Sequence, residues 1–336
     1  MKKNIFAVCD LEPGYACSFT EYLSHRKNLP FEIHAFTSAE SFLAFEKEHE
    51  VELLLISARA LNSAVKERPI GKIVVLSEGN DCRQSAYSCV YKYQSSAQVL
   101  RETLTAYSDA ARAPVIFPVM KKTTKIFGIY SPAGGSGKTS FSLAFAQELG
   151  RHMPVLYLNL EGCSGLEEIL GNCSAHSLSD LLYYARQQDG RIIHRINSIV
   201  QSFGQMDYIP PVRLAEDIHQ AKWEDLQFLI RQLITQSAYE ALVLEPGHET
   251  EYLLPLLELC DCIYMPVRHD ALSACKTGQF ETMLRLTGSE KLAERIEKIH
   301  VPKIKEVLPA DQYAAHLLWG EVGDLARKLL EDKNHD

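Results

Sequence analysis

A glycine-rich run that ends in a lysine and two hydroxyl residues lies near the middle of the chain. It follows an apolar stretch at 126–130 and precedes a stretch with helix-forming composition. In a strand-to-helix turn, backbone N–H groups and the helix N-terminus converge on an anion. The residue types suit phosphate, because glycines let the backbone wrap its oxygens, Lys138 supplies positive charge and the Thr139 hydroxyl can ligate Mg²⁺. We therefore predict that ATP and Mg²⁺ bind through a loop made of Ala133, Gly134, Gly135, Ser136, Gly137, Lys138, Thr139 and Ser140.

The strict phosphate-loop pattern GxxxxGK[ST] is not met, because Pro132 stands where its first glycine belongs. An ordinary glycine-rich turn is the alternative interpretation. The sequence GGSGKT between a strand-like run and a helix-like run is much more specific than a lone GxGxxG. We therefore keep the phosphate-binding interpretation.

Apolar runs of strand length alternate with helix-like stretches around and after this loop. The runs span 126–130, 155–160, 241–244 and 262–265. Strands that alternate with helices form a parallel sheet, and an open parallel sheet binds its ligands at the carboxyl ends of its strands. We expect a three-layer α/β domain over 125–336, with the loop at the ligand-binding edge.

The first hundred residues show the same alternation. Strand-like runs span 5–8, 31–36, 53–56 and 73–76, and a last strand and helix follow across 89–107. A capping box that begins at Thr37 predicts the start of one helix. Two prolines and three lysines interrupt the pattern at 111–125. We therefore predict a first parallel-sheet, three-layer domain at 1–112 and a linker at 113–124.

Composition limits the class of protein. A chain of 336 residues with 46% hydrophobic content can build two cores, and no apolar run approaches the roughly 20 residues that span a bilayer. The nine scattered cysteines favour reduced thiols and a cytoplasmic location, and no zinc-type spacing is present. The net charge of −8 gives no overall attraction to nucleic acid, although a local basic patch remains compatible with it.

The loop resembles the deviant Walker A motif KGGxGK[ST] of the MinD, ParA and nitrogenase-iron-protein class of P-loop ATPases. In that family a signature lysine reaches across a dimer to the partner's nucleotide. The matching position in this chain is Ala133. The resemblance therefore implies a homodimer formed through the ATPase domain, with slow or no ATP hydrolysis.

Two carboxylates extend the resemblance. Glu161 follows the second strand of this domain, where the family has an Asp-x-Asp, and Glu245 follows the run 239–244, where the family has its Walker B aspartate. Each could also be a surface residue at a strand end. The resemblance implies that Lys138, Glu161 and Glu245 are the catalytic residues and that Thr139 and Glu245 hold Mg²⁺.

The first domain resembles a response-regulator receiver, which has a flavodoxin-like fold and is phosphorylated on an aspartate after its third strand. Here Ser57 stands at the acceptor position, and Asp10 and Glu12 are what remains of the acidic cluster. Ser77 and Lys92 match the family's hydroxyl and lysine. A serine hydroxyl cannot form an acyl phosphate or replace a carboxylate on Mg²⁺. The resemblance therefore implies a pseudo-receiver that serves as an interaction domain.

A pseudo-receiver followed by a MinD-like ATPase without the signature lysine resembles the TadZ/CpaE family, which localises the tight-adherence (Flp) pilus machinery in bacteria. The resemblance covers essentially the whole chain. It implies a nucleotide-dependent localisation or scaffold factor in the cytoplasm, whose receiver-like domain contacts pilus or secretion proteins that recruit it to a cell pole or the inner membrane.

An active ATPase that drives partner release, or positioning of the chromosome- or plasmid-partition type, remains the alternative. A DNA-binding ParA would need a basic surface, and a nitrogenase-type reductase would need cluster-binding cysteines. The final helix, with Leu318, Val322, Leu325 and Leu329 on one stripe, is expected to pack on the sheet rather than anchor in a membrane. At most, membrane contact is peripheral.

Overall fold

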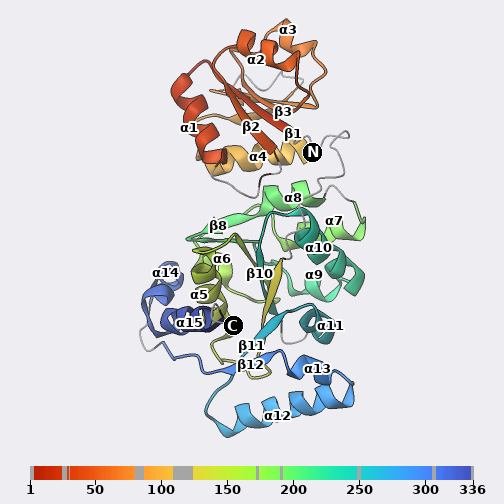
Figure 1. Cartoon of the computed structure of the whole chain (residues 1–336), viewed down its shortest axis with the longest axis vertical. Coiled ribbons are helices and arrows are strands. Elements are labelled where there is room, and N and C mark those ends of the chain that lie inside the picture. Colours follow the sequence, from red (N-terminus) through yellow and green to blue (C-terminus); the bar gives the residue numbers. More distant parts are fainter. Residues whose placement is uncertain are drawn as a thin grey trace. The chain divides into compact units, whose positions relative to one another are not determined.

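The computed structural model describes residues 4–24, 29, 31–79, 87–108, 124–171, 174–189, 192–247, 251–304 and 308–333. The chain divides into two compact units (Figure 1). The first comprises Met1–Val119 together with Asp189–Ser198 and Thr235–Ala238, and the second comprises the rest of the chain. The predicted linker at 113–124 lies outside the described residues except for Thr124.

The first unit is built on a five-stranded parallel sheet. Its elements are β1 (Asn4–Cys9), α1 (Pro13–Ser24), β2 (Phe31–Phe36), α2 (Ala39–Glu46), β3 (Val51–Ser57), α3 (Ser63–Lys66), β4 (Lys72–Ser77), β5 (Ser88–Tyr91) and α4 (Ser96–Ser108). The strand order is β2-β1-β3-β4-β5, and every pairing is parallel. This is the order of flavodoxin-like sheets.

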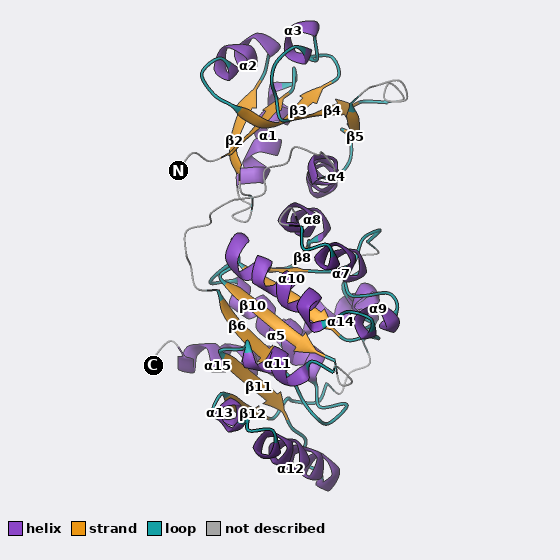
Figure 2. Ribbon diagram, turned by 90° about the vertical axis from the view of Figure 1, so that its right-hand side faces the viewer, coloured by secondary structure: helices purple, strands orange, loops and turns teal. Residues whose placement is uncertain are grey.

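Alternate residues of the same strands feed two separate cores, which makes this unit a three-layer sandwich. On β1, Phe6 and Val8 pack with residues of α1 and α4, whereas Ile5 and Ala7 pack with residues of α2 and α3. Successive side chains of a strand point to opposite faces, so a strand buried on both faces must be apolar throughout. Figure 2 shows helices on both sides of this sheet.

The second unit is built on a seven-stranded sheet. Its elements are β6 (Lys125–Ile129), α5 (Lys138–Gly150), β7 (Val155–Leu160), α6 (Leu166–Ile169), α7 (Leu178–Arg186), β8 (Gln201–Phe203), β9 (Met206–Tyr208), α9 (Ala215–His219), α10 (Trp223–Gln236), β10 (Ala241–Pro246), α11 (Leu253–Glu258), β11 (Cys262–Pro266), α12 (Ala271–Leu286), α13 (Glu290–Ala293), β12 (Ile296–Ile299), α14 (Ala310–Trp319) and α15 (Glu321–Lys333). One more helix, α8 (Ile192–Ile199), falls almost wholly within a segment that groups with the first unit.

The strand order of the second sheet is β12-β11-β6-β10-β7-β9-β8, parallel except for the β8–β9 hairpin. The chain leaves β6 toward β7 on one side and later crosses to β11 on the other, so β6 marks the switch point. In open parallel sheets the ligand crevice opens at the carboxyl ends of the strands beside such a point. The expected α/β architecture with two parallel sheets is therefore confirmed. Only the hairpin, which the sequence patterns did not suggest, departs from it.

The C-terminal stripe packs inside the second unit. It belongs to two helices, because Gly320 ends α14 before α15 begins. Val322 and Leu329 are buried in one apolar cluster with residues of α5 and of the strands. The expected packing inside the domain is confirmed, although the stripe lies in two helices rather than one and these helices pack mainly on α5 rather than directly on the sheet. None of the described helices is long and apolar enough to cross a membrane.

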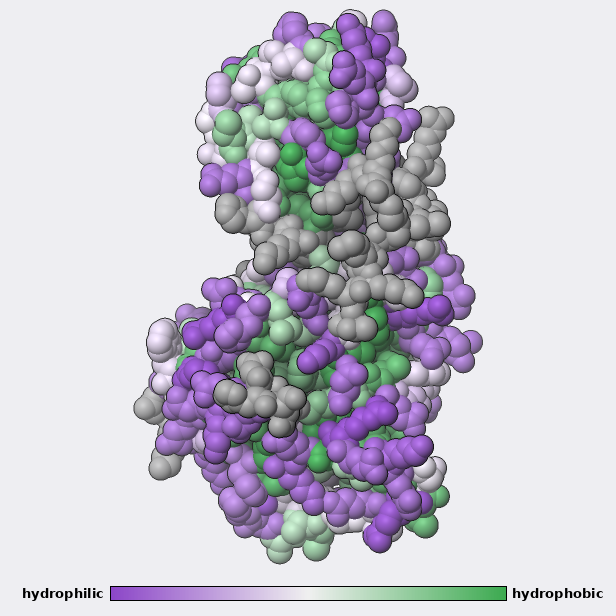
Figure 3. All heavy atoms as spheres, viewed as in Figure 1, coloured by the Kyte–Doolittle hydropathy of each residue, from purple (hydrophilic) through white to green (hydrophobic). Residues whose placement is uncertain are grey.

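Two local expectations were wrong. The helix predicted to start at Thr37 is capped by Ser38, whose hydroxyl accepts a hydrogen bond from the Ser41 amide. Cys89 takes part in a disulfide, so the expectation of reduced thiols does not hold there. It does hold for the free cysteines of the described residues, Cys9, Cys17, Cys163, Cys260, Cys262 and Cys275. The face of the second unit drawn in Figure 3 is covered largely by hydrophilic residues, with smaller apolar areas between them.

Candidate nucleotide-binding site

The predicted phosphate loop joins β6 to α5. Gly135 and Gly137 have φ angles of 64° and 85°, in the left-handed region that favours glycine. Gly137 caps α5 without a side-chain bond to the helix. Among the described residues, the backbone N–H groups from Gly134 to Gly137 have no recorded acceptor. A loop with free amides at a helix N-terminus is suited to hold an anion.

Two further features fit a phosphate chain. Ser136 is 6% exposed, and its hydroxyl has no hydrogen-bond partner among the described residues. A Cβ atom added at Gly134 would meet nothing within 4 Å, so the space beside that residue is open. A buried hydroxyl without a partner is costly unless a ligand supplies one. The residues present therefore fit a nucleotide phosphate chain.

Lys138 lies at the first position of α5 and is 6% exposed. Its ammonium group donates to the Glu161 carboxylate and, at 2.9 Å, to the Pro246 carbonyl. Its distance to the Glu245 carboxylate is 4.0 Å. The structure therefore brings together the lysine and the two carboxylates that the sequence placed at three separate strand ends.

Glu245 is fully buried, and it lies within β10 rather than after it. Its two carboxylate oxygens accept hydrogen bonds from the Thr139 hydroxyl at 2.6 Å and from the Tyr157 hydroxyl at 2.7 Å. Burial raises the pKa of Glu245, and the charge of Lys138 and the two hydroxyl donors only partly offset this effect. This carboxylate therefore needs its cationic and hydroxyl neighbours to stay ionised.

The two predicted Mg²⁺ ligands adjoin each other in the fold. The Thr139 hydroxyl oxygen and the Glu245 Oε1 atom are 2.6 Å apart. Adjacent ligands of an octahedral Mg²⁺ ion lie about 3 Å apart, since each ion–oxygen distance is about 2.0–2.1 Å. One ion could therefore contact both oxygens after a small adjustment, and it would neutralise charge on the phosphates.

Ala133 is buried, with 4% exposure. Its backbone N–H donates to the Ser131 hydroxyl at 3.2 Å, and its carbonyl accepts from the same hydroxyl at 3.1 Å. The start of the loop is thus fixed by local hydrogen bonds, and the side chain at this position carries no charge.

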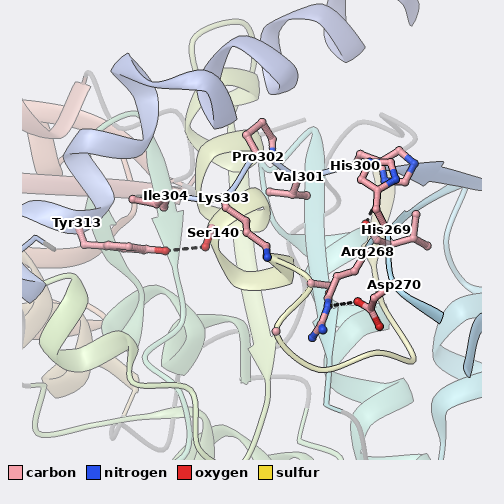
Figure 4. Close-up of a pocket in the computed structure, with 14 residues that line it drawn as sticks. Ser140, Arg268, His269, Asp270, His300, Val301, Pro302, Lys303, Ile304 and Tyr313 are labelled. Carbon is pink, nitrogen blue, oxygen red and sulfur yellow. Dashed lines mark hydrogen bonds and ion pairs between the residues drawn. The ribbon is translucent and has the colours of Figure 1, made fainter. Parts of the chain in front are cut away.

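A cavity of about 700 Å³ opens beside the loop (Figure 4). It is a suitable size for a small-molecule site. One wall is formed by the loop and the start of α5, and the others by the segments that follow β11 and β12 and by α14. Its lining residues are Gly135, Ser136, Gly137, Ser140, Val267, Arg268, His269, Asp270, His300, Val301, Pro302, Lys303, Ile304 and Tyr313.

Several contacts hold the cavity walls in place. The Ser140 hydroxyl and the Tyr313 hydroxyl lie 2.7 Å apart, which ties α5 to α14. The rings of His269 and His300, which also line the cavity, stack on each other with centroids 3.8 Å apart (Figure 4). A cavity with aromatic walls next to a phosphate loop can accept a nucleoside.

The residues that follow β11 and β12 line the cavity but are not among the site residues predicted from the sequence. Arg268 donates from Nη1 to the Gly134 carbonyl at 3.1 Å and so contacts the loop directly. It follows β11, and the carboxyl ends of parallel strands meet at one edge of the sheet. The same reasoning that selected Glu161 and Glu245 could therefore have selected Arg268.

The predicted residues of the first unit also come together. Lys92 has a buried side chain, and its ammonium group lies 2.9 Å from Asp10, 3.3 Å from Glu12 and 3.5 Å from Glu78. Burial lowers the pKa of Lys92, but the hydrogen bonds and charges of Asp10 and Glu12 outweigh burial and raise it.

The hydroxyl groups of this cluster are internal. Ser57 is the last residue of β3 and is buried, and its hydroxyl has no partner among the described residues. The Ser77 hydroxyl donates to the Gly79 carbonyl at 2.6 Å. The end of β3 therefore carries a small buried hydroxyl and no carboxylate at Ser57.

Comparison with known proteins supports the fold. No protein-family model matches the chain, and no curated protein sequence matches it. The crystal structure of a ParA family ATPase from Chlorobium tepidum has a TM-score of 0.50 at 19% identity, with 61% of this chain and 98% of that chain covered.

Two further solved structures are more distant. A plasmid partition protein from Borrelia burgdorferi has a TM-score of 0.45 at 16% identity, with 64% of this chain and 99% of that chain covered. An ATP complex of a McdA variant from Cyanothece has a TM-score of 0.40 at 16% identity, with 59% and 80% covered. These two values are too low to add to the argument. The match to the Chlorobium structure shows that the chain contains the fold of that ParA family ATPase.

Proposed function

We propose that the second unit binds ATP with Mg²⁺ and that the protein acts as a nucleotide-dependent localisation or scaffold factor. The observation that carries this proposal is the meeting of Lys138, Thr139, Glu161 and Glu245 at the glycine loop. Free amides would hold the phosphates, Lys138 would face the terminal phosphates, and Thr139 and Glu245 would hold the ion. The fold shared with a ParA family ATPase supports the same proposal.

Isothermal titration calorimetry of the full chain with Mg²⁺ and ATP tests the binding. Lys138→Ala is expected to weaken ATP binding at least about tenfold, because a charged hydrogen-bonding group is lost. Lys125→Ala is the matched control, since it removes an exposed lysine at the start of β6, at the opposite end of that strand from the loop. Equal affinity of all three proteins for ATP would remove the loop from the nucleotide site.

We infer further that hydrolysis is slow and that nucleotide holds a state of the protein. Ala133 contributes no charge at the position where related ATPases place a lysine. Loss of a comparable cation at a phosphoryl-transfer site reduces the rate by about 10³ to 10⁵. Release of phosphate by the wild-type protein at rates typical of active ATPases, without any partner, would favour the alternative of an enzyme that drives partner release.

A homodimer formed through the second unit is part of the proposal. Symmetric homodimers are the commonest soluble oligomers, and a bound nucleotide can stabilise one by mass action. Light scattering with and without Mg²⁺ and ATP measures the mass. A monomer at every protein concentration in the presence of ATP would contradict this part.

We propose that residues 1–112 form a pseudo-receiver that contacts pilus or secretion proteins and recruits the chain to a cell pole or the inner membrane. The buried Ser57 hydroxyl and the Lys92–Asp10 pair support an interaction role rather than a phosphorylated one. Acetyl phosphate is expected to leave the mass of the protein unchanged. A phosphoryl adduct on Asp10 would contradict the pseudo-receiver assignment, and retention of DNA by the protein at physiological salt would favour partition-type positioning.

A further inference from the structure

Arg268 lies outside the loop in sequence and hydrogen-bonds the loop backbone. Its Nη1 atom donates to the Gly134 carbonyl at 3.1 Å, and the same atom would lie 3.6 Å from a Cβ atom built on Gly135. Arg268 lines the cavity together with Gly135, Ser136 and Gly137. The guanidinium group is therefore placed beside the free amides of the loop.

The position of Arg268 is fixed by hydrogen bonds on the side away from the loop. Its Nε atom donates to the Asp270 carboxylate at 2.6 Å (Figure 4). Its backbone N–H donates to the Ser273 hydroxyl at 3.0 Å. Asp270 is itself held as the N-cap of α12, because it accepts from the Ser273 amide at 3.0 Å. A long side chain held at both its root and its Nε atom loses little freedom when it binds a ligand.

The guanidinium group of Arg268 has N–H donors that are not used in hydrogen bonds within the described part of the chain. Of its five N–H donors, one bonds Asp270 and one bonds Gly134, which leaves three without an acceptor in the described part of the chain. A planar fork of this kind matches the oxygens of a phosphate and can bond two of them at once.

The charges at the loop are another reason to expect a further cationic group on the phosphates. Lys138 is bonded to Glu161 and lies 4.0 Å from Glu245, so its charge is already shared with two carboxylates. Ala133 adds no charge. A polyphosphate therefore needs positive charge from outside the loop, and the described cavity lining offers it at Arg268 and Lys303. Of these two, Arg268 is hydrogen-bonded to the loop backbone.

We propose that Arg268 is a phosphate-binding residue that clamps the nucleotide's phosphate chain from the β11–α12 connection, in the same chain that supplies the loop. On binding, its free N–H groups donate to phosphate oxygens while Nε stays on Asp270. The proposal rests on the proposed ATP binding at the loop and adds a residue that the loop motif does not contain.

Titration calorimetry of the full chain with ATP and with adenosine, both with Mg²⁺, tests the clamp. Arg268→Gln is expected to weaken ATP binding about tenfold or more, as the loss of charged hydrogen bonds does, and to leave adenosine binding unchanged. Arg268→Lys keeps the positive charge but lacks the planar guanidinium group. Its affinity for ATP is expected to lie between those of the wild type and Arg268→Gln. Arg285→Gln, at the exposed far end of α12, removes the same charge and is expected to bind ATP as the wild type does.

The outcomes separate the two proposals. If the wild-type protein does not bind ATP, the proposed function fails. If it binds ATP and Arg268→Gln binds equally well, the clamp alone is wrong. Equal losses for ATP and adenosine would also overturn the clamp, because they would place Arg268 in the architecture of the cavity and not on the phosphates. Thermal unfolding midpoints show that each variant is folded at the temperature of the titration.

Discussion

At the scale of single residues, the site depends on how a buried carboxylate keeps its charge. Glu245 has no exposed surface, and its neighbours are one ammonium group and two hydroxyl donors. Removing such a group from water disfavours its ionised form, and only specific neighbours can compensate. The pKa of Glu245 therefore depends on the ammonium and hydroxyl groups that surround its carboxylate.

The pH dependence of stability should carry this signature. Burial raises the pKa of Glu245 above 4.5 in the folded protein. The folded state then binds the proton more readily than the unfolded chain, so the stabilisation that this proton provides is lost as the pH rises from 4.5 through the folded pKa. Relative to Glu245→Gln, the unfolding free energy of the wild type is expected to fall across that window.

Urea denaturation of both proteins without nucleotide, in steps from pH 4 to pH 8, measures the difference. A difference that grows in favour of the wild type as the pH rises would mean that the neighbours lower the pKa, and it would contradict the expected sign.

At the scale of elements, the loop between β6 and α5 has glycines with different tasks. Gly137 has a φ of 85°, and a Cβ atom there would lie 2.8 Å from a methyl carbon of Val301. Gly134 has no positive φ and open space around it. Gly137 therefore serves the fold of the loop, and Gly134 leaves room for a ligand.

A matched pair of substitutions separates these tasks. Gly137→Ala is expected to lower the unfolding free energy by roughly 1–3 kcal/mol, through backbone strain and the contact with Val301. Gly134→Ala is expected to change it by less than about 0.5 kcal/mol. Chemical denaturation of the two variants beside the wild type gives both values, and equal destabilisation would refute the distinction.

In the first unit, Lys92 joins the ends of two strands that are not adjacent, β1 and β5. Lys92→Met would leave Asp10, which is 1% exposed, without its counter-charge. Breaking a buried pair from one side costs about 3–5 kcal/mol, whereas replacing both partners costs much less. Lys92→Met is therefore expected to destabilise the protein strongly, and Asp10→Asn with Lys92→Met is expected to recover part of the loss.

Urea denaturation followed by circular dichroism compares these variants with Lys66→Met, an exposed lysine of α3 in the same unit. Equal urea denaturation midpoints for Lys92→Met and Lys66→Met would show that the Lys92–Asp10 pair does not stabilise the protein.

At the scale of the whole molecule, two sheets with separate apolar cores share one chain. A ligand stabilises only the structure that binds it, by about 2.7 kcal/mol at 100 times its Kd. Differential scanning calorimetry of the full chain is therefore expected to show two transitions, of which Mg²⁺ and ATP raise one. One transition that moves as a whole would show instead that the two units unfold together.

The sequence alone predicted many of the local features correctly. Apolar runs gave strands at 31–36 and 155–160 as the structure has them, and the glycine spacing located the loop at the start of α5. These features are visible in sequence because they depend on neighbouring residues: a strand buried on both faces, such as β7, is mostly apolar, and a tight turn needs glycine. The capping residue Ser38 was missed by one position, since Thr37 and Ser38 offer the same chemistry.

The tertiary structure decided which residues meet. Thr139 and Glu245 are 106 positions apart, and Gly134 and Arg268 are 134 apart. Local sequence patterns show where a strand ends, but only the order of strands in the sheet decides which ends are neighbours. The placement of β6 between β10 and β11 brings Glu245 and Arg268 to the loop from opposite sides, and this depends on the packing of the whole second unit.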